Sequence, residues 1–169
     1  MQTKEKVVNL GRERPKQYFH IRSTMNGKVL TVGKPGKDTG APGVGTMLRM
    51  HSRLFPPSDR QLFYFDHKQN LRSKINGYCL DSESEWVKLN RYDPNNIHAQ
   101  WTYCADGPRF FLKHNRDMVM DVRGESRRDD AEVIIFEYKG TSNQHFMLDY
   151  DISVVPDEEA EKEESCSLM

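Results

Sequence analysis

The sequence contains few apolar residues and no long apolar run. Apolar residues make up 36% of the 169 residues, and the mean hydropathy is -0.81. No stretch approaches the roughly 20 apolar residues that a membrane-spanning helix needs, and residues 1–6 lack the apolar core of a signal peptide. We therefore expect one domain with a modest core and a cytoplasmic location.

Cysteine is also scarce. The three cysteines, Cys79, Cys104 and Cys166, cannot all pair with one another, which favours a reducing compartment. The six histidines are dispersed without the spacing of metal ligands, and nothing resembles a nucleophile triad or a phosphate-binding loop. We expect a protein that is not an enzyme and that holds no metal and no cofactor.

Neither sign of charge is in excess. Lys plus Arg and Asp plus Glu each number 25, which excludes a strongly basic nucleic-acid binder. The charges are unevenly distributed, because residues 156–169 hold six acidic residues and one lysine. The rest of the chain therefore carries a mild positive charge, and we expect residues 1–16 to form a flexible basic arm.

The sequence contains one pattern that occurs three times. Each copy opens with an Asn-containing turn, continues with short aliphatic strands and closes with an aromatic residue. The openings are Asn26-Gly27, Asn76-Gly77 and Asn115-Arg116, and the closing aromatics are Phe63, Trp101 and Phe146. Four short strands per copy predict about twelve strands and almost no helix. The repetition favours a closed barrel, which removes exposed strand edges, over a β-sandwich.

These repeats resemble the ricin B-type lectins, a large group of β-trefoil domains. The resemblance covers residues 17–151 and rests on the repeated turns and on Gln-containing closings such as Gln61-Leu62-Phe63 and Gln144-His145-Phe146. It implies an all-β β-trefoil of three four-stranded repeats. The implied boundaries are a basic arm at 1–16, repeats at 17–66, 67–107 and 108–151, and an acidic tail at 152–169.

The resemblance also implies that each repeat can hold one sugar in a shallow pocket. Such a pocket needs a carboxylate that accepts hydrogen bonds from vicinal hydroxyls, an aromatic ring under the C–H face of the sugar, and amides that complete the hydroxyl contacts. The third repeat has all of these, in Asp121, Phe136, Asn143 and Gln144. The first repeat has Thr31 at the carboxylate position and Arg49 near the aromatic position, so we predict the working site in the third repeat.

The second repeat keeps part of the set. It has Asp81 as the carboxylate, but Asn90 occupies the aromatic position. Tyr92 or Trp86 could cover a sugar from nearby, although the resulting pocket would differ from that of the family. A second site at Asp81 and Tyr92 therefore stays open.

Structural roles are the alternative for each of these residues. Asp121 could equally cap a turn or pair with Arg123, and Phe136 lies in an apolar run and could belong to the core. We expect the three closing aromatics to lie in the core and not to contact a ligand. The prediction of a sugar site therefore depends on four residues coinciding in one repeat.

The last four residues carry a separate signal. Cys166-Ser167-Leu168-Met169 fits a prenylation motif with Cys166 as the modified residue. One lipid chain gives only marginal membrane binding, and the acidic tail would be repelled by anionic lipids. We expect weak membrane association if Cys166 is lipidated, and an unmodified acidic tail is the alternative.

Together these features predict a non-enzymatic lectin module whose partner is a glycan or glycoconjugate. The alternative is a β-trefoil scaffold that has lost sugar binding and binds a protein or a membrane surface, because a fold does not fix a function. The degeneracy of two copies and the basic loop at residues 123–128 support that alternative.

Overall fold

The computed structural model describes residues 16–35 and 40–151. These residues form twelve β-strands of one sheet and four short 3-10 turns, and no α-helix occurs among them. The first repeat supplies β1 (Phe19–Ser23), β2 (Val29–Val32), β3 (Leu48–His51), η1 (Asp59–Gln61) and β4 (Phe63–Phe65). The second supplies β5 (Leu71–Ser73), β6 (Cys79–Asp81), β7 (Lys88–Asn90), η2 (Ile97–Ala99) and β8 (Trp101–Cys104). The third supplies β9 (Arg109–Leu112), β10 (Asn115–Val122), η3 (Arg123–Glu125), β11 (Ala131–Glu137), η4 (Ser142–Gln144) and β12 (Phe146–Tyr150).

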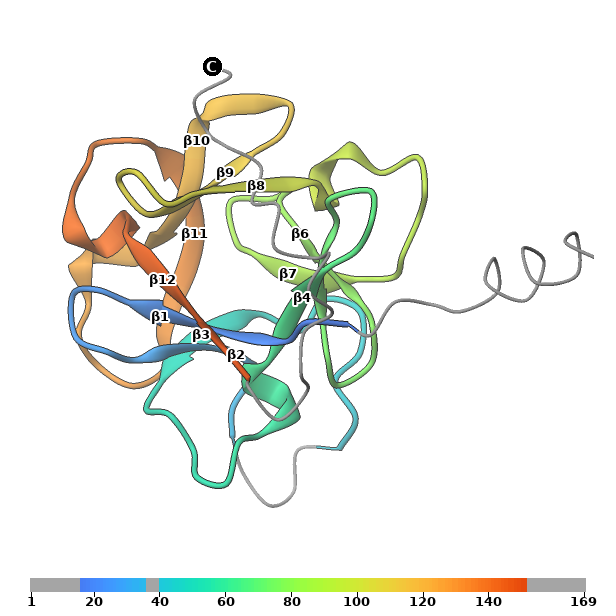
Figure 1. Cartoon of the computed structure of the whole chain (residues 1–169), viewed down its shortest axis with the longest axis horizontal. Coiled ribbons are helices and arrows are strands. Elements are labelled where there is room, and N and C mark those ends of the chain that lie inside the picture. Colours follow the sequence, from blue (N-terminus) through green and yellow to red (C-terminus); the bar gives the residue numbers. More distant parts are fainter. Residues whose placement is uncertain (1–15, 36–39, 152–169) are drawn as a thin grey trace, which may run out of the picture.

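Two strands from each repeat close into a barrel (Figure 1). β1 pairs with β12 and β4, β4 pairs with β5, and β8 pairs with β9. Backbone hydrogen bonds span the two remaining joints, from Trp101 N–H to the Gln69 carbonyl (3.0 Å) and from Phe146 N–H to the Pro108 carbonyl (2.7 Å). The predicted all-β β-trefoil is confirmed, and closure of the barrel satisfies edges that a flat sheet would expose.

The other six strands form three hairpins, β2–β3, β6–β7 and β10–β11, which are bridged to one another. The bridging pairs are Met47 with Lys88, Trp86 with Ile134, and Ala131 with Met50. Each hairpin therefore contributes residues to the surface of a neighbouring repeat. This sharing decides which side chains surround each candidate site.

The Asn-Gly turns join the first two strands of the first and second repeats. The side-chain oxygens of Asn26 and Asn76 each accept the backbone N–H two residues later, at 3.0 and 2.9 Å. Gly27 and Gly77 follow with φ values of 77° and 74°, a left-handed conformation that glycine adopts without steric cost. Both asparagines are turn residues, as predicted.

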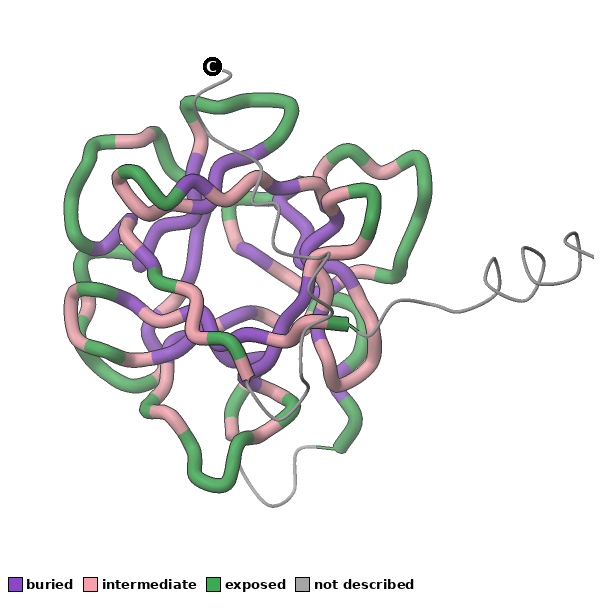
Figure 2. Tube along the Cα trace, in the orientation of Figure 1, coloured by how far each residue is buried: buried purple, intermediate pink, exposed green. Residues whose placement is uncertain are grey.

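The closing aromatics are among the largest residues of the shared core. Phe63, Trp101 and Phe146 are all fully buried, and the Trp101 indole N–H donates a hydrogen bond to the Leu80 carbonyl at 2.9 Å. Figure 2 shows the buried segments on the inner side of the ring of repeats, with exposed loops outside. The prediction that these aromatics belong to the core is confirmed.

Two cysteines lie in the described part of the chain. Cys79 and Cys104 are both buried free thiols. Burial raises the pKa of the Cys79 thiol to about 11, against the weaker opposing effect of the Arg72 guanidinium. Because the thiolate is the reactive species, Cys79 acts as a small apolar residue at neutral pH. Cys166, the acidic tail and all of the predicted arm except Lys16 lie outside the described residues.

Candidate functional site

Asp121 is the centre of the candidate site in the third repeat. It lies near the end of β10 and is 5% exposed. Its Oδ2 accepts a hydrogen bond from Gln144 Nε2 at 2.8 Å, and its Oδ1 accepts one from Asn143 Nδ2 at 3.3 Å. Both amides belong to η4. The structure therefore brings together three of the four residues predicted for this site.

Arg123 does not pair with this carboxylate. Its Nη1 instead lies 2.9 Å from Glu132 Oε2, on the adjacent strand β11. The alternative prediction, an ion pair between Asp121 and Arg123, is therefore wrong. The carboxylate is held by neutral amides, which orient its oxygens without neutralising its charge.

Gln144 and Gln61 hold the same place in the third and first repeats. Gln144 Nε2 also donates to the Glu137 carbonyl at 2.8 Å, and its Oε1 accepts the Lys139 N–H at 2.7 Å. Gln61 makes the same two backbone bonds, at 3.1 and 2.9 Å, with the loop after β3. Both hydrogens of the Gln144 amide are therefore engaged within the protein, one of them by Asp121 and the other by the Glu137 carbonyl at the end of β11.

Asn143 is engaged in the same way. Its Nδ2 donates to the Val122 carbonyl at 3.1 Å in addition to Asp121, and Thr141 Oγ1 donates to its Oδ1. The donors of both amides are therefore occupied, and the main charged acceptor for ligand hydroxyls is the Asp121 carboxylate, which can accept about four hydrogen bonds in total.

Phe136 lies on the same side of the β10–β11 hairpin as Asp121. Asp121 pairs with Ile134, and Phe136 follows two residues later, where it pairs with the buried Val119. Side chains two residues apart on a strand share one face. Phe136 is 48% exposed, so it does not belong to the core. An exposed ring beside a held carboxylate can pack against the C–H face of a sugar.

Burial also changes the acidity of Asp121. Desolvation raises the pKa of this carboxyl above its ordinary value, the hydrogen bonds from Gln144 and Asn143 act in the opposite direction, and Glu125 raises the pKa slightly further. A raised pKa marks a group whose charge is costly to keep in the protein. Ligand hydroxyls that donate to this carboxylate would offset part of that cost.

The second repeat has a cavity at the place where the third repeat has the aromatic ring of Phe136. A cavity of about 260 Å³ lies over β6 and β7, lined by residues that include Val44, Asp81, Glu83, Lys88 and Asn90. Asp81 pairs with Lys88, so Asn90 occupies the place that Phe136 has in the third repeat. The lining carries charged and amide groups but no aromatic side chain.

Sequence reasoning missed one residue of this second site. Asn96 Nδ2 donates to Asp81 Oδ2 at 2.7 Å, beside Asn90 Nδ2 at 3.1 Å. Asn96 is also the N-cap of η2, and its position directly before a short turn is the signal that could have found it. The other predicted residue, Tyr92, is 39% exposed and lies against the Arg72 guanidinium at 4.9 Å from its ring centre.

In the first repeat, internal contacts fill the corresponding position. Thr31 pairs with Arg49, so the residue equivalent to Phe136 is His51, two residues beyond Arg49; this register corrects the placement of Arg49 near the aromatic position. Arg49 Nη1 donates to the Asp130 carbonyl at 3.1 Å, and His51 Nε2 lies 3.3 Å from Asp130 Oδ1. Thr31 supplies no carboxylate at the first position, and the imidazole of His51 at the second is mostly buried beside Asp130.

Residues 16–35 and 40–151 contain no helix with the length and apolar character of a membrane span. The same residues contain no group of three or more His, Cys, Asp or Glu side chains that could hold a metal ion.

The sequence profile of the ricin-type beta-trefoil lectin domain matches residues 17–146. No curated protein sequence matches the chain significantly.

Three solved structures illustrate the similarity in fold. The earthworm R-type lectin C-half in complex with GalNAc has a TM-score of 0.71 and 27% identity, over 81% of this chain and 100% of that one. An earthworm lectin C-terminal domain mutant in complex with 6'-sialyllactose has a TM-score of 0.69 and 28% identity, over 81% and 100%. The designed threefold-symmetric protein ThreeFoil shares the fold, with a TM-score of 0.66 and 24% identity over 78% and 97%.

Proposed function

Because the chain belongs to the family of ricin-type beta-trefoil lectin domains, we propose that it is a non-enzymatic module that binds one sugar in its third repeat. The observation that carries this proposal is the combination of the buried Asp121, held by two amides, with the half-exposed ring of Phe136. Of the three equivalent positions, the third is the one that has both a carboxylate and an aromatic ring.

The chemistry expected of the site follows from these groups. Two vicinal hydroxyls would donate to Asp121, and the C–H face of the same ring would pack on Phe136. GalNAc is the first ligand to test, since the similar earthworm lectin half is in complex with it. The amides of Asn143 and Gln144 would keep the carboxylate fixed while the ligand binds.

The test is calorimetric titration of GalNAc, together with a glycan array, on the whole chain and on two matched variants. Asp121→Asn should weaken binding by at least about tenfold, because it removes a charged hydrogen-bond acceptor. Asp81→Asn makes the same change in the second repeat and should leave affinity unchanged. Equal losses in both variants, or binding that survives Asp121→Asn, would overturn the third-repeat assignment.

A second candidate function has one specific observation in its favour. The loop after β3 exposes a run of apolar residues, with Phe55 80% exposed and Leu54 39% exposed. Such a loop suits a protein partner or a membrane surface. Phe55→Ser should reduce sedimentation with lipid vesicles or capture by a partner if this function holds, and should leave GalNAc binding intact.

The lipidation of Cys166 stays a prediction from the sequence. It would add a marginal membrane anchor to either function. Intact-mass measurement of the protein from its native source tests it, since a farnesyl group adds a defined mass that Cys166→Ser abolishes.

A further inference from the structure

Trp86 belongs to the second repeat but lies at the rim of the third. It is bridged to Ile134 of β11, and Ile134 pairs in turn with Asp121 of β10. Paired residues on adjacent antiparallel strands project to the same face and lie about 5 Å apart. Asp121, Ile134 and Trp86 therefore form a row across three strands, with Trp86 about 10 Å from the carboxylate residue.

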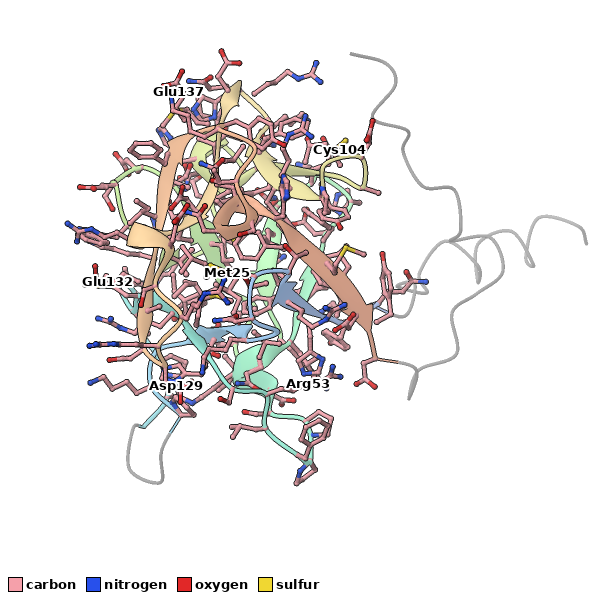
Figure 3. All side chains as sticks on the ribbon, turned by 90° about the vertical axis from the view of Figure 1, so that its left-hand side faces the viewer. Met25, Arg53, Cys104, Asp129, Glu132 and Glu137 are labelled. Atoms are coloured by element: carbon pink, nitrogen blue, oxygen red, sulfur yellow. The ribbon has the colours of Figure 1, made fainter. Side chains whose placement is uncertain are left out.

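Arg123 joins Trp86 to the same site. The Arg123 guanidinium lies over the Trp86 indole, 4.7 Å from the ring centre, and its Nη1 is 2.9 Å from Glu132 Oε2. Glu132 is labelled on β11 in Figure 3. Stacking on an aromatic ring and pairing with a carboxylate together fix the orientation of a guanidinium, which has five N–H donors. Arg123 is thus a preorganised donor two residues beyond Asp121.

The equivalent rim positions of the other repeats carry different side chains. Met47 is bridged to Lys88 at the second site, and Glu132 pairs with Arg49 at the first. The aromatic residue therefore occurs at the rim of the same repeat that has the carboxylate and Phe136. Trp86 is also half-buried and is not one of the residues of the hydrophobic core, so the core does not account for a tryptophan at this place.

We propose that Trp86 and Arg123 form a second subsite, which receives the next unit of an oligosaccharide whose terminal sugar is bound at Asp121 and Phe136. This inference rests on the proposed function of the third repeat. The second ring of a disaccharide can span the distance from Asp121 to Trp86, where the indole offers apolar surface and Arg123 offers donors to hydroxyl or N-acetyl oxygens.

The experiment compares GalNAc with a neutral disaccharide that carries GalNAc at its non-reducing end, by calorimetric titration of the whole chain. The disaccharide should bind more tightly than GalNAc. Trp86→Ala should weaken the disaccharide by about three- to tenfold, the size of one stacking contact, and leave GalNAc unchanged. Trp86→Phe should keep most of the affinity for the disaccharide. Arg123→Gln should weaken the disaccharide and leave GalNAc unchanged, as Trp86→Ala does.

Phe55→Ala is the matched control, because Phe55 is an exposed aromatic that, like Trp86, lies against an arginine, with Arg53 at 5.6 Å. It should change neither affinity. Thermal denaturation of each variant identifies a folding defect, and Trp86→Phe decides the question if Trp86→Ala fails to fold. The subsite is overturned if Trp86→Ala weakens both ligands equally or if the disaccharide gains nothing over GalNAc. Absence of all sugar binding by the unmodified chain overturns the proposed function as well, so the two failures are distinguishable.

Discussion

The second and third repeats have the same arrangement of strands and differ in the side chains around the equivalent carboxylates, Asp81 and Asp121. Asp121 is held by two amides from η4 and lies on the same face as the half-exposed ring of Phe136. Asp81 is held by Asn90 and Asn96 and borders a cavity whose lining has no aromatic side chain. Both strand ends thus present a fixed carboxylate, and what separates them is whether a sugar would find an aromatic ring to pack on.

The largest expected effect separates buried from exposed aromatics of the third repeat. Phe146→Ala should lower the free energy of unfolding by about 3–5 kcal/mol, because it leaves a cavity in the core. Phe136→Ala should cost under about 1 kcal/mol and yet abolish most sugar binding. Urea denaturation and GalNAc titration of both variants check this pair. Retained GalNAc binding in Phe136→Ala would remove the ring from the site.

A smaller effect separates the two equivalent glutamines. Gln144→Ala and Gln61→Ala should each destabilise the fold by about 1–3 kcal/mol, because buried polar groups lose their partners. Gln144→Ala should also weaken GalNAc binding, since Asp121 loses the hydrogen bond at Oδ2, while Gln61→Ala should not. Thermal denaturation with titration distinguishes the two. Equal affinity in both variants would show that Asp121 needs no positioning by Gln144.

Acid should lower the stability of the fold through His20, which lies on β1. Burial, and then the Arg53 guanidinium, lower the pKa of His20 below its ordinary 6.5, against the opposing effects of Asp149 and Asp151. Because the folded state favours the neutral ring, this contribution to stability is complete above about pH 6.5 and is lost as the pH falls below that value.

The melting temperature should therefore fall between about pH 7.5 and pH 5.5, and less so in His20→Gln. His51 and His145 have pKa values lowered by burial as well, so a part of the pH dependence should remain in that variant. An unchanged pH profile in His20→Gln would exclude His20 as a source.

The smallest expected effect is a gain of weak binding in the second repeat. Asn90→Phe places a ring at the position equivalent to Phe136, and Asp81 keeps its hydrogen bond from Asn96. We expect the calorimetric stoichiometry to rise toward two sugars per chain, with the new site the weaker one. A stoichiometry that stays at one would show that the cavity over β6 and β7 excludes a sugar for another reason.

The fold was predictable because its signals are local and repeated. Asn26 and Asn76 make the predicted turns, and the aromatic that closes each repeat is buried in the shared core, as at Trp101. The alternation of short strands depends on residues close in sequence, and the threefold echo then leaves few ways to bury them together.

The site was less predictable because it depends on register and on contacts between distant segments. The sequence identifies Asp121 and Gln144, but the bond between them joins residues 23 positions apart. The register of β3 places His51, two residues beyond Arg49, at the position equivalent to Phe136. The contact between Asn96 and Asp81 depends on the geometry of the turn before η2, which the sequence does not specify. Trp86 belongs to one repeat by sequence and to another by position, which no periodicity reveals.

The bridging of the three hairpins has a consequence for engineering. If the third repeat were copied three times to make a symmetric protein, the rim of each site would carry the counterpart of Glu132 and never that of Trp86, because each rim is supplied by a neighbour. A substitution at one of these bridging positions therefore changes the rim of the site in a neighbouring repeat.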